Sequence, residues 1–151
     1  MRRVRARDTQ PERQVRSLLH RYGFRFRLHV RTLPGTPDIV LPRHGAVVLV
    51  HGCFWHGHGC ARSKLPQTRQ EFWRNKIGAN RARDEDDARR LRELGWRILV
   101  IWECALRGRS RLSTDLVAMF SRNFLFGDEV EVFIEGERPS PPHEGQTSRD
   151  H

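Results

Sequence analysis

The segment 51–60 of the 151-residue chain holds two cysteines and three histidines, a density that few folds accommodate without a metal. Zinc prefers thiolate and imidazole ligands in a tetrahedral arrangement. The spacing of Cys53, His58 and Cys60 lets one loop wrap an ion, and the only other cysteine, Cys104, follows a predicted buried strand. A Cys3His site would use every thiol, whereas disulfide pairing leaves one over. With four protein ligands, such a zinc would be structural. The alternative is a set of free thiols beside a surface run of histidines.

The hydrophobic pattern predicts one mixed α/β domain. Helices are expected at 10–22, 68–94 and 113–122, and strands at 24–31, 38–41, 46–50 and 97–101. Patterns typical of capping boxes, Thr9 to Glu12 and Thr68 to Glu71, are expected to open the first two helices. The order of elements favours a mixed sheet with helices packed on its faces. We expect this domain to cover residues 1–136 and residues 137–151 to form a disordered tail.

Several aromatic and aliphatic side chains are candidates for the core. The long helix at 68–94 is expected to bury an apolar face supplied by Phe72, Trp73, Ile77, Ala88, Leu91 and Leu94. Trp96 and Trp102 bracket a predicted strand and are interpreted as core residues.

The charge of the chain indicates a polyanionic partner. Basic residues number 28 against 18 acidic ones, a net charge of +10, and all but two of the basic residues are arginines. Arginine presents a planar fork that suits phosphate oxygens and guanine edges, so nucleic acid is the first candidate. An arginine-rich surface caused by biased codon usage is the alternative. No apolar run is long enough for a membrane span and no secretory signal opens the chain, so we expect a cytoplasmic protein. No oligomerisation signal is visible in the sequence, so we expect a monomer.

Three polar residues outside the predicted zinc site suit hydrolysis of a phosphodiester. His56 lies between the zinc ligands, and an imidazole fixed there is a candidate general base, as is His51 to a lesser degree. Asp38 enters a strand from a Pro-Gly turn, and the backbone carbonyl of Val50 can lie beside it. Such hard oxygens suit Mg²⁺. The alternatives are a solvated loop for the histidines and a turn residue for Asp38, and capping alone accounts for Glu12.

Three aromatic residues are candidates for contact with bases. Phe54 and Trp55 are adjacent in the predicted loop, where burying both is difficult, and Trp73 lies at the start of the long helix. Aromatic rings exposed on an arginine-rich surface can stack on bases or wedge between base pairs. The alternative is that Phe72 and Trp73 belong to the core.

Taken in order, the motifs resemble one family. The segments 33–38, 51–56, 71–80, 94–97 and 102–107, together with Cys60, are similar to the Vsr-type very-short-patch-repair DNA mismatch endonucleases over about residues 1–125. The resemblance implies a restriction-endonuclease-like α/β fold with a structural zinc. It also implies an enzyme that nicks double-stranded DNA on the 5′ side of the T in a T:G mispair left by deamination of 5-methylcytosine. A location on the bacterial nucleoid is expected with this activity.

The resemblance also implies roles for individual residues. Asp38 would bind the catalytic Mg²⁺ directly, beside Val50, where the family can carry a threonine and this chain offers only its backbone carbonyl. His56 would be the general base, and His51 and Glu12 would hold metal-bound waters. The zinc ligands would be Cys53, His58, Cys60 and Cys104, and the wedge that opens the duplex would be Phe54, Trp55 and Trp73. Two alternatives remain: a nuclease of the same fold that serves a restriction–modification system and cuts paired DNA, and a zinc-stabilised DNA-binding module without catalysis.

Overall fold

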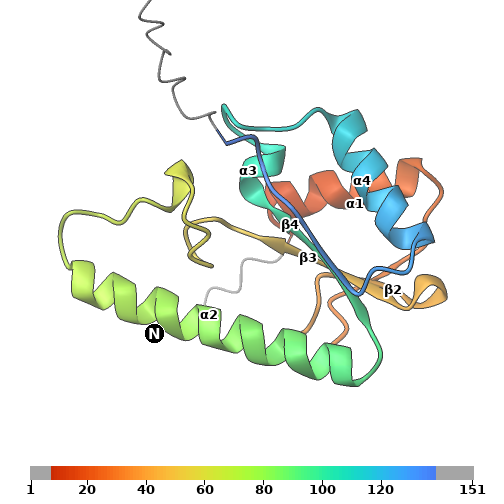
Figure 1. Ribbon diagram of the computed structural model, residues 1–151, viewed down its shortest axis with the longest axis horizontal. Helices are drawn as coiled ribbons and strands as arrows, with labels where there is room; N and C mark the ends of the chain where they lie inside the picture. The colour runs from red at the N-terminus through yellow and green to blue at the C-terminus, as the bar shows by residue number, and fades with distance from the viewer. Residues whose placement is uncertain (1–7, 139–151) are drawn as a thin grey trace, which may run out of the picture.

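The computed structural model describes residues 8–138, which form a mixed α/β sheet flanked by helices, as the sequence predicts (Figure 1). The strands are β1 (Arg27–Leu28), β2 (Ile39–Leu41), β3 (Ala46–His51), β4 (Arg97–Trp102) and β5 (Glu131–Ile134). The helices are α1 (Gln10–Arg21), α2 (Gln70–Glu93), α3 (Glu103–Leu106) and α4 (Thr114–Phe126), with single 3₁₀ turns η1 (Pro42–His44) and η2 (Ala61–Ser63). None of these helices combines the length and apolar character needed to span a membrane.

The sheet brings two strand ends together that lie far apart in the sequence. Its strands follow the chain order β1-β2-β3-β4-β5, with β1, β2 and β3 antiparallel and β3, β4 and β5 parallel. In the parallel pair, His51 at the end of β3 lies opposite Trp102 at the end of β4. Because the carboxyl ends of parallel strands meet at one edge, the loop that follows β3 and the helix α3 that follows β4 start side by side.

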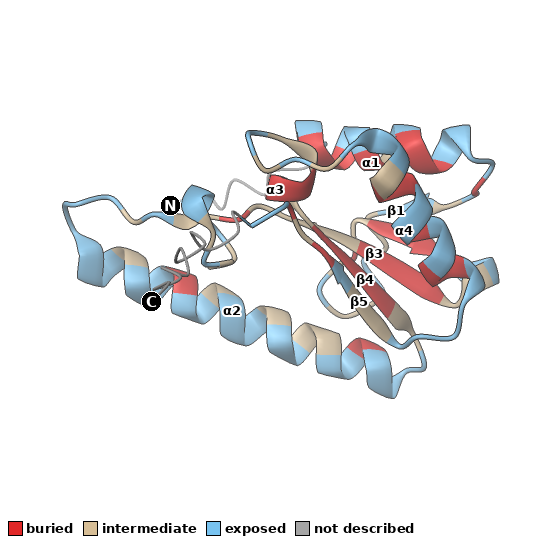
Figure 2. Ribbon diagram, turned by 45° about the horizontal axis from the view of Figure 1, so that its top comes forward, coloured by how far each residue is buried: buried red, intermediate tan, exposed pale blue. Residues whose placement is uncertain are grey.

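Alternating side chains of the central strands pack into two cores, one on each face of the sheet. Helices α1, α3 and α4 cover one face, and α2 crosses the other (Figure 2). Val48 and Leu99 face the first core, whereas Val47 and Ile98 face the second, as the two-residue period of a strand requires. Strands β3 and β4 are therefore buried on both faces, which makes them a rigid base for the residues at their ends.

Helix α2 differs from its prediction in start and in burial. It begins at Gln70, and its N-cap residue Arg69 is left-handed (φ 56°) with no side-chain cap, so the predicted capping box at Thr68 is wrong. Only the C-terminal part of α2 lies over the sheet, while its N-terminal half runs beneath the loop that follows β3 (Figure 1). Phe72 is consequently exposed. Leu94, the C-cap residue at the other end of the helix, is exposed as well, whereas Ile77 and Leu91 are buried as expected.

The first predicted strand, at 24–31, is also largely wrong. Only Arg27 and Leu28 pair with β2, and both are exposed at the edge of the sheet. His29 adopts a left-handed φ of 46°, which ends the strand and turns its imidazole toward α1. Phe24 and Phe26 still reach the first core, but Leu28 is exposed and Val30 packs against the second core, so the alternation predicted burial only in part.

The C-terminal part of the described chain holds more structure than the sequence indicates. The predicted helix 113–122 runs to Phe126, with Ser113 as its cap: the Ser113 hydroxyl accepts from the Leu116 N–H at 3.1 Å. Strand β5 and helix α3 were not predicted. β5 has only four residues and half-buried valine and glutamate side chains, a pattern too short to identify. The predicted tail 137–151 falls outside the described residues from 139 onward.

Candidate functional site

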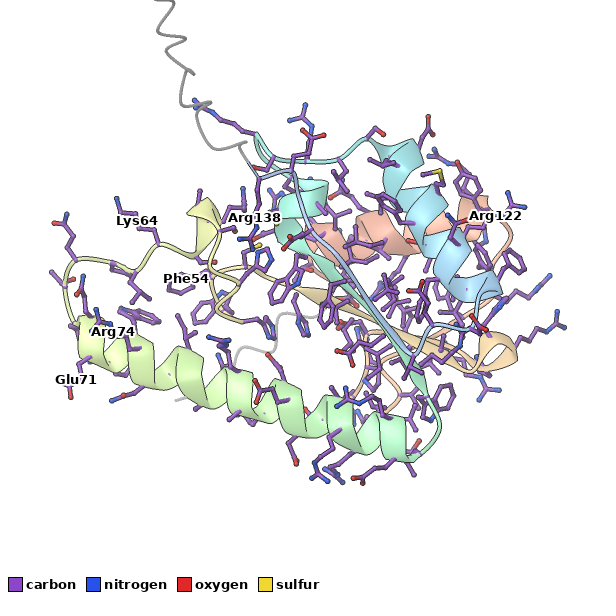
Figure 3. The ribbon with its side chains drawn as sticks, viewed as in Figure 1. Phe54, Lys64, Glu71, Arg74, Arg122 and Arg138 are labelled. Atoms are coloured by element: carbon purple, nitrogen blue, oxygen red, sulfur yellow. The ribbon has the colours of Figure 1, made fainter. Side chains whose placement is uncertain are left out.

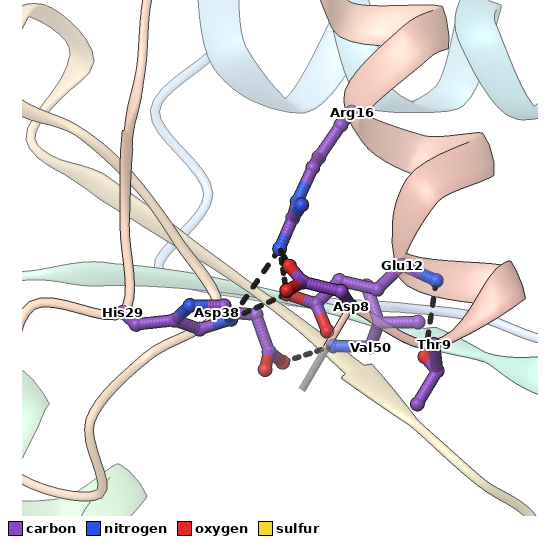
Figure 4. Close-up of polar contacts among 7 residues, drawn as sticks. All are labelled: Asp8, Thr9, Glu12, Arg16, His29, Asp38 and Val50. Carbon is purple, nitrogen blue, oxygen red and sulfur yellow. Dashed lines mark hydrogen bonds and ion pairs between the residues drawn. The ribbon is translucent and has the colours of Figure 1, made fainter. Parts of the chain in front are cut away.

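Asp38 lies where β2 begins, next to the end of β3. Its Oδ2 accepts a hydrogen bond from the Val50 N–H at 2.9 Å (Figure 4). Burial raises the pKa of Asp38 to about 6, and the nearby Glu12 adds to the rise, while the Val50 hydrogen bond opposes it. One carboxylate oxygen is therefore held by the backbone in a poorly solvated position, the setting that a bound cation stabilises most.

Glu12 is 2% exposed and projects from α1 toward the same place. The Thr9 hydroxyl accepts from the Glu12 N–H at 3.4 Å, so half of the predicted capping box forms. The carboxylate does not complete the box, because its Oε1 lies 2.6 Å from both Arg16 Nη2 and His29 Nε2. Glu12 is therefore more than a cap. His29 and Arg16 are contacts that the sequence patterns did not reveal.

His51 and His56 form a stacked pair at the end of β3. Their ring centroids are 3.9 Å apart with an interplanar angle of 3°. Burial, together with the neighbouring His56, lowers the pKa of His51 to about 3, so His51 stays neutral at physiological pH.

Asp84 of α2 determines the tautomer of His56. Its Oδ2 lies 2.5 Å from His56 Nδ1, and a carboxylate can only accept a hydrogen bond. Nδ1 therefore carries the proton and Nε2 is left with a free lone pair, which is the arrangement of a general base and its orienting acid. Asp84 was not among the predicted site residues. Its position in the sequence could have indicated it, because Asp84 lies one helical turn after Asn80 and so shares a face of α2 with it. The Asn80 amide on that face donates to the Trp55 carbonyl at 3.0 Å.

The acidic and the histidine groups belong to one site. His51 directly follows Val50, whose N–H holds Asp38, and the charges of Glu12 and His56 both act on the pKa of Asp38. The structure therefore places the four predicted residues Asp38, Glu12, His51 and His56 together at the same edge of the sheet, although they come from different elements.

Cys53, His58, Cys60 and Cys104 converge as the sequence analysis predicts. Their candidate ligand atoms all lie within 4.8 Å of one another. The three cysteines are free thiols, so no disulfide competes with a metal. Three of the four residues come from the loop after β3, and Cys104 comes from α3 directly after β4.

The surroundings of this Cys/His cluster suit a soft cation such as zinc. Two backbone N–H groups donate to sulfur at 3.3 Å, Cys104 to Cys53 and Gly136 to Cys104, which favours thiolate over thiol. His58 directs Nδ1 toward the cysteines, while its Nε2 lies 2.8 Å from Glu135. A carboxylate behind a histidine in this way is the usual support of a zinc ligand.

The thiols differ in ionisation. Burial raises the pKa of Cys53 and of Cys104. Burial also opposes ionisation of Cys60, but hydrogen bonds, first from His58, outweigh it and lower its pKa to about 7. Glu135 was missed because β5, which precedes it, was not predicted.

Trp102 connects the histidine pair to the Cys/His cluster. Its ring stacks on His58 at 4.2 Å with an interplanar angle of 21°, and it meets His51 edge-on at 5.3 Å. The sequence analysis interpreted Trp102 as a core residue. It is half-buried and packs against the core beneath α2, but it also forms a wall shared by both parts of the site.

Phe54, Trp55 and Trp73 form an aromatic cluster between the loop and the N-terminal half of α2. The centroids of their rings lie 5.1 to 5.9 Å apart in edge-on contacts. Trp55 is 49% exposed, and Figure 3 shows Phe54 between the loop and the helix. Phe72 packs against Trp73 at 5.2 Å and is itself exposed, so the expectation that it belongs to the core is wrong.

Comparison with known proteins identifies similar sequences. The family model "DNA mismatch endonuclease Vsr" matches residues 1–62. The chain is 53% identical over 116 residues to the Type II nicking enzyme V.XorIIP of Xanthomonas oryzae pv. oryzae, covering 77% of this chain and 85% of that protein. It is 44% identical over 135 residues to DNA mismatch endonuclease Vsr of Escherichia coli K12, covering 89% of this chain and 86% of that protein. The Type II nicking enzyme V.NmeAIP of Neisseria meningitidis is 38% identical over 110 residues, with 73% and 79% covered.

Proposed function

The chain belongs to the Vsr family of DNA mismatch endonucleases, and we propose that it nicks double-stranded DNA on the 5′ side of the T in a T:G mispair, using Mg²⁺. Deamination of 5-methylcytosine is the proposed source of such mispairs. The observation that carries the proposal is the placement of an oriented imidazole, His56 with Asp84, at the same edge of the sheet as the buried carboxylate of Asp38.

The residues at the end of β2 and β3 fit a hard divalent cation. Asp38 has one oxygen bonded to the Val50 N–H and offers the other, and the Val50 carbonyl at the end of β3 is the proposed second ligand. Glu12 and His51 are proposed to hold water molecules of the ion. When bound, Mg²⁺ would neutralise the phosphate and stabilise the charge that develops on it.

His56 is proposed to accept the proton of the attacking water. Its Nε2 lone pair is free because Nδ1 donates to Asp84, and the negative charge of Asp84 stabilises the imidazolium that forms. His51 stays neutral, since burial lowers its pKa to about 3, and its flat stacking against His56 keeps the basic ring in one orientation. A positioned base of this kind contributes roughly 10²–10⁴-fold to a hydrolytic rate.

Zinc is the proposed occupant of the Cys/His cluster, with a structural role. Cys53 and His58 flank His56 in sequence, and Cys104 joins the same loop to the end of β4. A four-ligand ion there would hold the loop, and with it His56, at a constant position relative to Asp38.

The aromatic cluster is proposed to open the duplex at the mispair. A T:G wobble pair is less well stacked than a Watson–Crick pair, so separating it from its neighbour requires less energy. Unstacking costs a few kcal/mol per step, and base–aromatic stacking returns ~1–3 kcal/mol per base. The exposed ring of Trp55 and its neighbours Phe54 and Trp73 are positioned for this contact. The net positive charge of the chain supports binding to the phosphate backbone.

A nicking assay on matched duplexes tests the proposal. T:G and T:A duplexes of otherwise identical sequence are incubated with the zinc-loaded protein, with and without Mg²⁺. The expected result is a single-strand nick beside the mispaired T that requires Mg²⁺. Equal nicking of both duplexes would contradict the mismatch specificity, and a double-strand cut in paired DNA would favour a restriction-type nuclease. Unchanged activity of Asp38→Ala would contradict the proposed catalytic site.

A further inference from the structure

Strand β5 leaves one side of the sheet open. It is the last strand in the sheet order and pairs, among the residues that the structure describes, with β4 alone (Figure 2). The Ile98 N–H donates to the Val130 carbonyl at 2.8 Å, so the backbone of Val130 points toward β4. Because this direction alternates along a strand, the N–H and C=O groups of Glu131 and Phe133 point outward. Such outward groups are the ones to which a further strand binds.

An apolar groove lies beside these outward groups. It has a volume of about 430 Å³, and its apolar lining comes from α4 and β5: Phe120, Phe124, Val132, Phe133 and Ile134. Phe120 and Phe133 are 39% and 57% exposed although both are large aromatic side chains. Alternate side chains of a strand added to β5 would face the α4 side of the sheet, where the groove lies. The groove and the outward groups of β5 therefore form one surface, called here the β5 edge.

The β5 edge is acidic in a chain that is otherwise basic. Residues 128–137 include five acidic residues and no lysine or arginine, whereas the whole chain has a net charge of +10. Glu129 and Glu135 line the groove itself. A negative surface repels the phosphates of DNA and attracts cationic side chains. DNA, the proposed substrate of the enzyme, is therefore not the ligand that suits this edge.

A second copy of β5 does not suit the β5 edge either. Two antiparallel β5 strands related by a twofold axis at Phe133 would place Glu131 opposite Glu135. An axis at Val132 would place Glu129 opposite Glu135. Like charges directly opposite each other destabilise a strand pair. The charge of the edge thus favours an occupant of opposite sign over a copy of itself.

We propose that the β5 edge binds an extended segment of a partner protein as an additional strand, one in which lysine or arginine alternates with apolar residues. The alternation follows from β5, because Val132 and Ile134 pack toward the first core, whereas Glu131 faces α2 and pairs with Arg92. The apolar side chains of the segment enter the groove, and its basic side chains meet the glutamates. Backbone hydrogen bonds to Glu131 and Phe133 complete the contact. The inference does not rest on the proposed nicking activity.

A labelled peptide tests the proposal on the full chain. The probe is a fluorescein-labelled peptide of seven residues in which lysine and valine alternate, and its binding is followed by fluorescence anisotropy. We expect saturable binding of this peptide and none of a peptide with glutamate in place of lysine. A peptide with proline in place of valine keeps the charge but lacks half of the backbone N–H groups, and it should not bind as a strand.

Matched variants locate the binding. Glu129→Lys and Phe133→Ala should each weaken binding of the lysine–valine peptide by about fivefold, the size of one favourable cross-strand pair. Glu85→Lys makes the same charge change on the exposed side of α2, and Phe126→Ala removes another exposed ring, so both should bind the peptide as the unaltered chain does. Amide hydrogen exchange at Glu131 and Phe133 should slow when the peptide is added, because their N–H groups become bonded.

Four results would overturn the proposal. Equal binding of the lysine–valine and lysine–proline peptides, or equal weakening by Glu85→Lys and Glu129→Lys, would show a general charge effect. Unchanged amide exchange at Glu131 and Phe133 would exclude strand addition, and this measurement on the unaltered chain decides even if a variant does not fold. Dimers in sedimentation equilibrium that Phe133→Ala dissociates would assign the edge to a second copy instead.

Discussion

Replacing Asp38 by asparagine is expected to stabilise the metal-free fold while it abolishes nicking. Asparagine has the same shape, and its amide oxygen can still accept the Val50 N–H. It removes a charge that burial and Glu12 both disfavour. The substitution therefore separates what the carboxylate does for the reaction from what it does to the fold.

The size of the effect follows from the pKa of Asp38. Burial raises it from 3.8 to about 6. At about 1.4 kcal/mol per pKa unit, ionised Asp38 lowers the free energy of unfolding by about 3 kcal/mol. The direction of the pH dependence is that of an acid with a raised pKa. The loss of free energy of unfolding is complete above about pH 6 and shrinks as the pH falls. It vanishes below the pKa that Asp38 has in the unfolded chain. Asp38→Asn should gain about 3 kcal/mol at about pH 7.5 and roughly half of that at about pH 5.

Urea denaturation followed by tryptophan fluorescence measures the gain, with zinc present and Mg²⁺ absent. Asp128→Asn, an exposed aspartate after α4, is the control and should change the free energy of unfolding little at either pH. Asp38→Asn should lose nicking of a T:G duplex at every pH. A destabilised Asp38→Asn protein, or a gain that does not decline between about pH 7.5 and pH 5, would refute the interpretation of Asp38 as a buried carboxylate whose charge destabilises the metal-free fold.

Three further substitutions test the remaining parts of the site. Asp84→Asn should slow single-turnover nicking by roughly 10²–10⁴-fold, because an amide can donate to Nδ1 and so move the proton of His56 to Nε2. A decrease of the nicking rate by less than about tenfold would contradict the role of Asp84. Cys104→Ser should lose zinc, measured by elemental analysis, and with it the order of the loop 51–60; full zinc content would exclude Cys104 as a ligand. Trp55→Ala should weaken binding to a T:G duplex by ~1–3 kcal/mol, measured by fluorescence anisotropy, and equal weakening for T:A would exclude a wedge.

Local patterns predicted most helices and the buried strands, and they failed where a longer-range contact prevailed. Helix α1 begins after Thr9 as expected, since a cap is made within one turn. The similar pattern at Thr68 does not form a cap, because the chain arrives from the loop with Arg69 left-handed and its guanidinium over the Phe72 ring. β5 is identifiable only through its pairing with β4, which joins residues more than thirty positions apart.

Residue type and spacing were enough to single out residues that the structure brings together, namely the Cys/His cluster, Asp38, the two imidazoles and the aromatic cluster. The chemistry of a candidate ligand belongs to its own side chain and immediate neighbours, so it is visible in the sequence. The partners that direct this chemistry came from elsewhere. Asp84, on α2, sets the tautomer of His56. Glu135, directly after β5, lies behind His58. Arg16 contacts Glu12 next to His29, which ends the edge strand β1. These contacts arise when helices pack on the sheet, and packing brings together residues whose separation along the chain carries no signal of their contact.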